Sequence, residues 1–364
     1  MAKPTISQVA RKIASAGLDW EAGETPLTAL PEADQDIRLG VQVPPGEQER
    51  VAAALAAAPE GFAAFDSARD WRDVDGKNWI TAVRDQGNCG SCVAHGTVAA
   101  MEAQARIEHK DPTWDLNLSE ADLFFCGAGK RCSQGWWPTE ALKYASSKGI
   151  ADEACFPYVD HDVDCTVCSD KASRMLKVGA SKELISPGDR KGWIDTNGPV
   201  IACMAVYADF FNYKNGVYRH ATGPLRGYHC ITCVGYNEDE GYWICKNSWG
   251  TSWGDNGFFK IAYGEAEIDS KFAMWGVENI SGTLRPAEEE DGEQGTDMAD
   301  YVVVRDGSKD GSAILLAHVK GGWRHLALSS QRLASLGPIA FSSTAVEVTY
   351  KGEDILTLNA WKKY

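Results

Sequence analysis

The sequence predicts an α+β protein in which a helical half and a β-rich half enclose a cleft, with an added segment at each end. From about residue 70 the chain is rich in cysteine and aromatic residues, and apolar residues recur at helical spacing. Beyond about residue 185, short apolar runs alternate with glycines and turn residues, which is typical of strands. A helical section followed by a section of strands indicates an α+β core with a cleft between two lobes.

The composition describes a folded chain and argues against one class of partner. Of the 364 residues, 44% are apolar and 13 are tryptophan, which is enough for a sizeable core. The formal net charge of −15 argues against nucleic acid as a main partner, because phosphate binding needs a basic surface. No run approaches the roughly 18 apolar residues of a membrane span, so we expect none.

The compartment stays open at this stage. The chain as written starts with an amphipathic run and lacks the apolar core of a signal peptide, which suits the cytoplasm. The cysteine pattern instead suits secretion or another oxidising compartment, where disulfides persist.

Residues 1–65 form an N-terminal extension without a cluster of catalytic residue types. The spacing predicts a helix over 4–16, which ends at Gly17, and an Ala-rich helix over 46–58. Two interpretations are open. The extension packs on the main domain as a stabilising element, or it is a short prosegment that covers the active site until it is removed.

Residues 66–284 form the main domain. Helices are predicted over 117–125 and 138–145, after a helix that starts near Cys92. The strands predicted in the second half cover 200–206, 229–236, 242–246 and 257–262.

The C-terminal part divides into a linker and a small module. Residues 286–300 carry seven acidic residues and no basic one, so we expect residues 285–300 to form a solvated acidic linker. Residues 301–364 then form a small β-rich accessory module without recognisable chemistry, and any partner or surface that it binds is unknown. Its predicted strands cover 301–305, 313–319, 323–328 and 346–350.

The eleven cysteines suggest a lobe that is cross-linked locally. Seven of them lie between positions 89 and 168, and the odd total leaves at least one thiol free. The other four lie in apolar runs, where we interpret most of them as small buried hydrophobic residues. These four are Cys203, Cys230, Cys233 and Cys245.

The stretch Gln86-Gly-Asn-Cys89-Gly-Ser-Cys92 is the first candidate for a site. The spacing after it predicts that Cys92 lies in the first turn of an amphipathic helix. Backbone N–H groups and the helix dipole there favour the thiolate, the nucleophilic form of cysteine. Two cysteines spaced in this way also suit a disulfide or half of a zinc site, so the motif alone leaves three interpretations open.

A cysteine nucleophile also needs an imidazole and a group that orients it. His229 begins an apolar strand 137 residues after Cys92 (229 − 92), and Asn247 follows another strand 18 residues later (247 − 229). The carbonyl oxygen of Asn247 would accept the imidazole N–H, and Trp249 would shield that bond from water. Taken singly, a histidine at a strand edge and an asparagine before Trp-Gly are usually structural.

Together these features resemble the papain-like cysteine peptidases over about residues 70–282. The resemblance rests on four blocks in the same order: Asp85-Gln-Gly-Asn-Cys-Gly-Ser-Cys92, Leu118-Ser-Glu120 with Cys126 and Cys132, Tyr228-His229 through Val234-Gly-Tyr236, and Lys246-Asn-Ser-Trp-Gly250 through Trp253-Gly254. It implies a papain-like two-lobe fold and an enzyme that hydrolyses peptide or protein substrates through an acyl-enzyme (thioester) intermediate. It implies no cofactor and no metal, because a thiolate nucleophile needs neither.

The resemblance also implies roles for single residues. Cys92 would be the nucleophile, His229 the general base and then acid, and Asn247 the residue that orients the imidazole. The side-chain amide of Gln86 and the backbone N–H of Cys92 would form the oxyanion hole. The substrate would be bound by Gly135, Trp136, Trp137, Cys230 and Trp249, with Cys230 facing the same pocket as the first two tryptophans.

The disulfides of the family have counterparts here. They would correspond to Cys89–Cys132 and Cys126–Cys165. Cys155 and Cys168 then remain as a third pair.

The chain departs from the family pattern in three places. Val93 and His95 follow the nucleophile where the family usually has Trp and Phe, which would alter the cleft wall behind the thiol. Gln134 replaces one glycine of the usual Asn-Gly-Gly run. The N-terminal extension lacks the long helical pattern of the commonest prosegments.

The leading interpretation is an endopeptidase held latent by its N-terminal segment. The same fold and thiol would also serve an exopeptidase, a peptide ligase or an amidase. A non-catalytic binding protein is a third class. The intact set of Cys92, His229, Asn247 and Gln86 argues against it.

Overall fold

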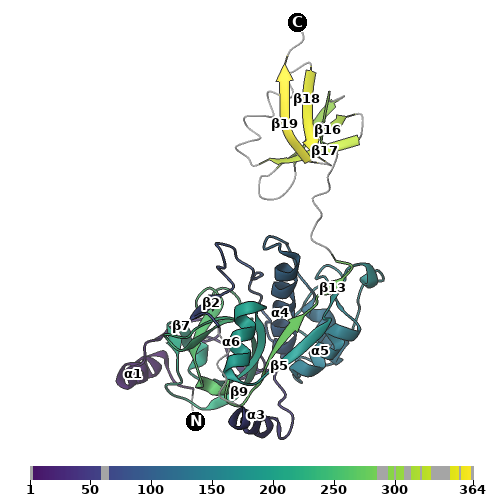
Figure 1. Ribbon diagram of the computed structural model, residues 1–364. Coiled ribbons are helices and arrows are strands. Elements are labelled where there is room, and N and C mark those ends of the chain that lie inside the picture. Colours follow the sequence, from purple (N-terminus) through teal and green to yellow (C-terminus); the bar gives the residue numbers. More distant parts are fainter. Residues whose placement is uncertain are drawn as a thin grey trace. The chain divides into compact units, whose positions relative to one another are not determined.

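The computed structural model describes residues 3–58 and 65–284, and six strands between residues 294 and 361. The chain divides into two compact units, Met1–Pro286 and Ala287–Tyr364, which are described separately (Figure 1). No helix in the described ranges is both long and apolar enough to cross a membrane.

The helical lobe of the first unit is built around α4 (Cys92–His109), and α5 (Pro138–Ser147) packs against it. Every residue from Cys92 to Val98 is buried, so the expectation of an amphipathic helix is wrong for this end. The physical reason is that β-strands cover one side of α4 and α5 covers another. The helix predicted over 117–125 starts at Glu120 and continues as the π-helical segment η1 (Asp122–Ala128), and the hydroxyl of Ser119 caps it by accepting the N–H of Asp122 at 2.9 Å.

The β-rich lobe contains a sheet of eight strands in the order β5-β12-β6-β9-β10-β11-β8, with β2 paired to β9. The strands predicted in this lobe are confirmed as β6, β9, β10 and β11. The sheet is antiparallel except where β11 pairs with β8. Its strands are β2 (Ala68–Asp70), β5 (Ala180–Leu184), β6 (Val200–Tyr207), β8 (Val217–Tyr218), β9 (Leu225–Asn237), β10 (Tyr242–Lys246), β11 (Phe258–Ala262) and β12 (Met274–Glu278).

Shorter elements complete the first unit. Helix α6 (Pro187–Thr196) packs on β9, and β3 (Ile150–Ala151), β4 (Met175–Lys177) and β13 (Ser281–Gly282) form a small separate sheet. Three 3₁₀ turns are η2 (Lys171–Ser173), η3 (Phe210–Asn212) and η4 (Glu265–Glu267).

The N-terminal extension is folded onto this unit. Its predicted helices are confirmed as α1 (Ile6–Ala16), which ends at Gly17 in the left-handed conformation, and α3 (Glu47–Ala57). Between them lie β1 (Glu21–Ala22), which pairs with β7 (Tyr213–Asn215), and the short helix α2 (Glu32–Asp36). The indole of Trp20 is buried against Tyr213 and donates to the carbonyl of Arg219 at 2.9 Å, so the extension is anchored in the core of the β-rich lobe.

The second unit contains one six-stranded sheet in the order β14-β18-β19-β17-β16-β15. The four predicted strands are confirmed, and two were not predicted. One of these, β14, lies inside the segment expected to be a linker. Five of the seven acidic residues, at positions 288–293, precede this strand, and only one, Asp297, lies within it. The strands are β14 (Gln294–Met298), β15 (Tyr301–Asp306), β16 (Ala313–Val319), β17 (Gly322–Leu328), β18 (Ala345–Lys351) and β19 (Asp354–Trp361).

Candidate active site

Cys92 is the first residue of α4, as its motif predicts, and it is fully buried. Burial raises the pKa of its thiol to about 12, and the nearby Cys230 thiol adds to the shift. Backbone N–H groups of Cys230, Gly40 and Val93 act in the opposite direction. The thiol is therefore neutral in this structure. One of the groups around it, Gly40, belongs to the N-terminal extension.

His229, on β9, and Asn247, just after the neighbouring strand β10, form a hydrogen-bonded pair. His229 lies in β9, Asn247 directly follows β10, and Nε2 of the imidazole is 2.8 Å from Oδ1 of the amide. Because the N–H of Ser248 also donates to this Oδ1, at 2.8 Å, the oxygen is an acceptor and the imidazole must donate from Nε2. Nδ1 has no hydrogen-bond partner of good geometry within the described residues, although the nearby Arg38 backbone acts to raise the pKa of the ring, so Nδ1 remains as the basic atom.

The surroundings keep the imidazole neutral. Burial lowers the pKa of His229 to about 4, although the hydrogen bond to Asn247 acts in the opposite direction. The ring of Trp249 lies 4.7 Å from the imidazole, centroid to centroid, and is itself buried. Trp249 therefore packs beside the His229–Asn247 pair and lies in the core.

The side-chain amide of Gln86 is oriented from both ends. Its Oε1 accepts the hydroxyl of Ser248 at 2.7 Å, and its backbone N–H donates to the carbonyl of Ser248 at 2.9 Å. Its Nε2 donates to the carbonyl oxygens of Cys89 at 2.7 Å and Arg38 at 3.0 Å. The Arg38 carbonyl thus takes a hydrogen bond that Gln86 would offer to a substrate oxygen.

Residues 40–42 of the extension add a strand-like contact beside Cys92. The N–H of Trp136 donates to the carbonyl of Gly40 at 2.7 Å, and the N–H of Gln42 donates to the carbonyl of Trp136 at 2.8 Å. The N–H of Val41 donates to the carbonyl of Tyr228 at 3.2 Å. The extension therefore bonds to both lobes here.

Two glycines make this close approach sterically feasible. A Cβ on Gly40 would lie 1.9 Å from the carbonyl oxygen of Gly90, and a Cβ on Gly135 would lie 2.3 Å from that of Gly40. Neither position has room for a side chain. A single glycine in a sequence carries no sign of such a contact, so the sequence did not indicate a role for Arg38 or Gly40.

The five residues expected to bind substrate occupy different surroundings. Gly135 and Trp136 contact the extension through their backbones, as described. The side chain of Trp137 packs on Phe272 and Trp275, with ring centroids 6.4 and 5.6 Å away.

Cys230 does not lie where we expected it. Its sulfur would be 2.8 Å from a Cβ on Gly96, so it lies beneath α4. His229 and Cys230 are neighbours on β9, and neighbouring side chains of a strand point to opposite faces. Because the imidazole points to Asn247, the thiol points into the core.

His95 also lies behind the nucleophile, not in the wall of a cleft. Its Nδ1 lies 3.1 Å from the carbonyl oxygen of Ser91, and its ring meets the edge of Tyr158. The hydroxyl of Tyr158 donates to the carbonyl of Gln86 at 2.7 Å and lies 2.6 Å from the hydroxyl of Ser91. His95, Ser91 and Tyr158 therefore support the loop that carries Gln86. Burial lowers the pKa of His95 to about 4.

A cluster of buried ionisable groups lies deeper beneath the site. Lys246 donates to the hydroxyl of Thr81 at 3.1 Å, and that hydroxyl donates to the carboxylate of Glu102. Lys246, Glu102 and Glu120 line one small cavity of about 10 Å³, which has room for a single water molecule. Burial, with the nearby Glu102 as a second cause, raises the pKa of Glu120 to about 8, and burial lowers the pKa of Lys246 to about 8.

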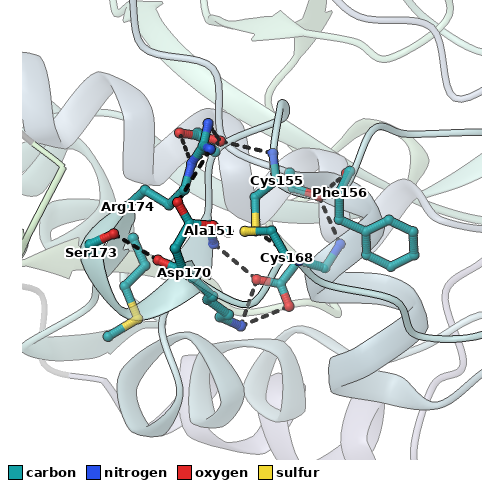
Figure 2. The surroundings of a disulfide bond; sticks show 12 residues. Ala151, Cys155, Phe156, Cys168, Asp170, Ser173 and Arg174 are labelled. Carbon is teal, nitrogen blue, oxygen red and sulfur yellow. Dashed lines mark hydrogen bonds and ion pairs between the residues drawn. A yellow bond between two sulfur atoms is a disulfide. The ribbon is translucent and has the colours of Figure 1, made fainter.

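The three expected disulfides are present. Figure 2 shows the surroundings of one of them, Cys155–Cys168, with Arg174 and Asp170 nearby. Arg174 is 2.8 Å from Asp152, whose carboxylate also accepts the N–H of Cys155 at 3.0 Å. The other two bonds are Cys89–Cys132 and Cys126–Cys165.

Comparisons with known proteins identify the family. A family model described as papain family cysteine protease matches residues 65–276. The chain is 32% identical over 257 residues to a gut-specific cysteine proteinase of Caenorhabditis elegans, across 63% of this chain and 75% of that protein. It is 34% identical over 238 residues to cathepsin B-like cysteine proteinase 2 of Haemonchus contortus, across 54% of this chain and 68% of that protein.

Solved structures show the same fold. Procathepsin B S9 from Trypanosoma congolense is similar with a TM-score of 0.63 at 24% identity, across 76% of this chain and all (100%) of that one. Digestive procathepsin L2 from the midgut of Tenebrio molitor larvae has a TM-score of 0.60 at 25% identity, across 75% of this chain and 89% of that one. The papain-like α+β fold is confirmed, and the chain belongs to the papain family of cysteine proteases.

Proposed function

We propose that this chain is an endopeptidase that uses Cys92, His229, Asn247 and Gln86, and that residues 38–42 hold it latent. One observation carries the latency: the Arg38 carbonyl is bonded to the Gln86 amide while Gly40 lies against the Cys92 thiol. The part of the extension that passes through the site therefore occupies both the oxyanion donor and the space in front of the nucleophile.

The chemistry follows from the atoms that are free to react. The Sγ proton of Cys92 passes to Nδ1 of His229, while Nε2–H stays bonded to Asn247. The thiolate attacks the substrate carbonyl carbon, and the resulting oxyanion accepts hydrogen bonds from Nε2 of Gln86 and the N–H of Cys92. The C–N bond breaks, Nδ1 returns its proton to the amine, and a water molecule then hydrolyses the thioester.

The electrostatics of the covered site support latency. A buried thiol with a pKa near 12 and a buried imidazole with a pKa near 4 favour the neutral pair over thiolate and imidazolium. When residues 38–42 leave, water returns to both groups and the desolvation that opposes their charges falls. Removal of residues 38–42 therefore exposes Cys92 and His229 and activates them in one step.

The path of the extension supports internal cleavage of substrates. Residues 38–42 lie in the middle of a continuous chain between α2 and α3, and their backbone bonds to Gln86, Tyr228 and Trp136. A site that accommodates a chain extending in both directions suits an endopeptidase. A substrate is expected to use the backbone of Trp136 as Gly40 and Gln42 do.

The test compares the full chain with its Gly40→Ala variant, using an irreversible epoxide inhibitor of thiol proteases and intact mass. The added Cβ must displace Gly40 from Gly90. Overpacking of this kind typically costs about 1–3 kcal/mol, so we expect labelling and peptide hydrolysis to rise about 5- to 150-fold. Gly23→Ala is the matched control, because its Cβ would meet only the flexible side chain of Lys214.

The outcomes separate the parts of the proposal. One adduct that disappears in Cys92→Ser supports the nucleophile, and no adduct on either folded protein would overturn it. Equal labelling of Gly40→Ala and the wild type would overturn the latency alone. A digest of a peptide library with the Gly40→Ala protein should show internal cleavage. Trimming confined to peptide ends would overturn the endopeptidase proposal.

A further inference from the structure

Two of the free cysteines face each other inside the β-rich lobe. Cys233 on β9 and Cys245 on β10 are register partners, and their sulfur atoms are 3.2 Å apart. Both side chains are fully buried. Neither residue belongs to the three disulfides.

The strand geometry suits a covalent bond between them. The register shifts between Ile244 and Cys245, so the pair lies beside a bulge, but Cys245 and Cys233 still oppose each other. Opposed residues of antiparallel strands have Cα atoms about 4.5–5.5 Å apart, and disulfides typically span about 4.4–6.8 Å. The two sulfurs must approach by little more than about 1 Å to reach bonding distance. Rotation of the two side chains supplies this movement while the backbone stays in place.

The chain already has a cross-linked lobe. Its three disulfides lie in the segment from Cys89 to Cys168, so the protein folds where dithiols are oxidised. A facing pair of thiols on adjacent strands meets the same oxidant during folding. We propose that Cys233 and Cys245 form a fourth disulfide, between β9 and β10.

The reaction is thiol–disulfide exchange with a small disulfide of the glutathione type as oxidant. The thiolate of one cysteine attacks that disulfide and releases one thiol, and the second cysteine then attacks the mixed disulfide and releases the other. Two protein thiols and one small disulfide give one protein disulfide and two small thiols. Because both side chains are inaccessible once folded, the exchange takes place while β9 and β10 are pairing.

The position of this bond ties it to the catalytic pair. Cys233 lies four residues after His229 on β9, and Cys245 lies two residues before Asn247. The bond therefore joins the two strands whose relative position sets the 2.8 Å contact between imidazole and amide. It covalently fixes the register on which that contact depends.

The experiment refolds the full chain with reduced and oxidised glutathione, alkylates it in denaturant and counts the modified cysteines by intact mass. A glutathione adduct counts as a free cysteine. Of eleven cysteines, six belong to the three disulfides and five are free. We expect three modified cysteines in place of five, and a linked peptide that contains Cys233 and Cys245.

Two matched variants test the assignment. Cys245→Ala should leave four modified cysteines, whereas Cys203→Ala, a buried cysteine on the neighbouring β6, should leave two. Five modified cysteines in a wild type that has the three known disulfides would overturn the proposal. So would a linked peptide that joins Cys203 to Cys230, which are register partners on β6 and β9.

Discussion

The carbonyl oxygen of Arg38 lies 3.0 Å from the amide nitrogen of Gln86, and the guanidinium of the same residue lies 3.0 Å from Asp85. Arg38 is thus bonded through both its backbone and its side chain to the loop that carries the proposed oxyanion donor. In our proposal the backbone bond blocks the site. The ion pair stabilises that arrangement.

The Arg38–Asp85 ion pair predicts that Arg38→Ala weakens latency less than Gly40→Ala does. Arg38→Ala keeps the blocking carbonyl and removes the ion pair to Asp85, whose side chain is 55% exposed, together with a 3.3 Å hydrogen bond to Asn88. An ion pair with one exposed partner contributes at most about 1 kcal/mol, so we expect the peptidase activity of the full chain to rise by no more than about fivefold. Initial rates with a fluorogenic peptide check this against Gly40→Ala. A rise larger than that of Gly40→Ala would contradict the view that the backbone contact dominates.

The hydrogen bond from Ser248 to Gln86 predicts that Gln86→Ala and Ser248→Ala lower kcat of the activated protein by different factors. Gln86→Ala removes an oxyanion donor and should lower kcat by about 10²–10³. Ser248→Ala removes only the hydrogen bond that positions the amide, which typically contributes about 0.5–1.5 kcal/mol, so kcat should fall about 2- to 12-fold. Both variants are measured in the Gly40→Ala background, with KM and kcat determined separately. If Ser248→Ala changed KM alone, its positioning role would be wrong.

The buried Glu120 predicts a loss of stability as the pH rises. Its folded pKa of about 8 lies above the ordinary 4.5, so the folded state retains a proton that the unfolded state releases between these values. The stabilisation from neutral Glu120 is full below about pH 4.5 and is lost as the pH approaches 8. Because one pKa unit corresponds to about 1.4 kcal/mol, we expect Glu120→Gln to reduce this loss by more than about 2 kcal/mol.

Guanidinium unfolding at pH 5 and pH 8 measures this difference. Both proteins carry Cys92→Ser, which prevents self-digestion. Glu102 stays in both, and burial raises its pKa as well, so only the difference between the variants reports on Glu120. Parallel stability curves for the two proteins would show that folding does not raise the pKa of Glu120.

The Cys155–Cys168 disulfide predicts a local contribution to stability. The two residues are separated by 13 positions, and cross-linking a loop of this size contributes about 3 kcal/mol in the chain-entropy description. Replacing both residues by Ser should lower the free energy of unfolding by about this amount, while the Arg174–Asp152 ion pair holds the loop in place. The measurement is chemical denaturation of the Cys92→Ser protein with and without the double substitution. An unchanged free energy would place the stabilisation of this loop in its polar contacts alone.

Local patterns in the sequence predicted much of this protein. The Cys92 motif, the block at His229 and the block at Asn247 led to the family because such motifs need residues of set types at set spacings. The helices of the extension and the strands of both units follow from periodicity, which is a local property of the chain. The roles assigned to the site residues stay predictions until the variants are measured.

Only the tertiary structure decided how distant segments meet. No spacing rule places the Arg38 carbonyl on Gln86, or Gly40 between Gly90 and Gly135, because these contacts depend on packing between segments far apart in the chain. The same holds for Cys233 and Cys245, since the sequence predicts two buried strands and not the register that opposes their sulfurs. The residue types and their order therefore come from the sequence, whereas the blocked site and the facing thiols come from the pairing of strands and loops in three dimensions.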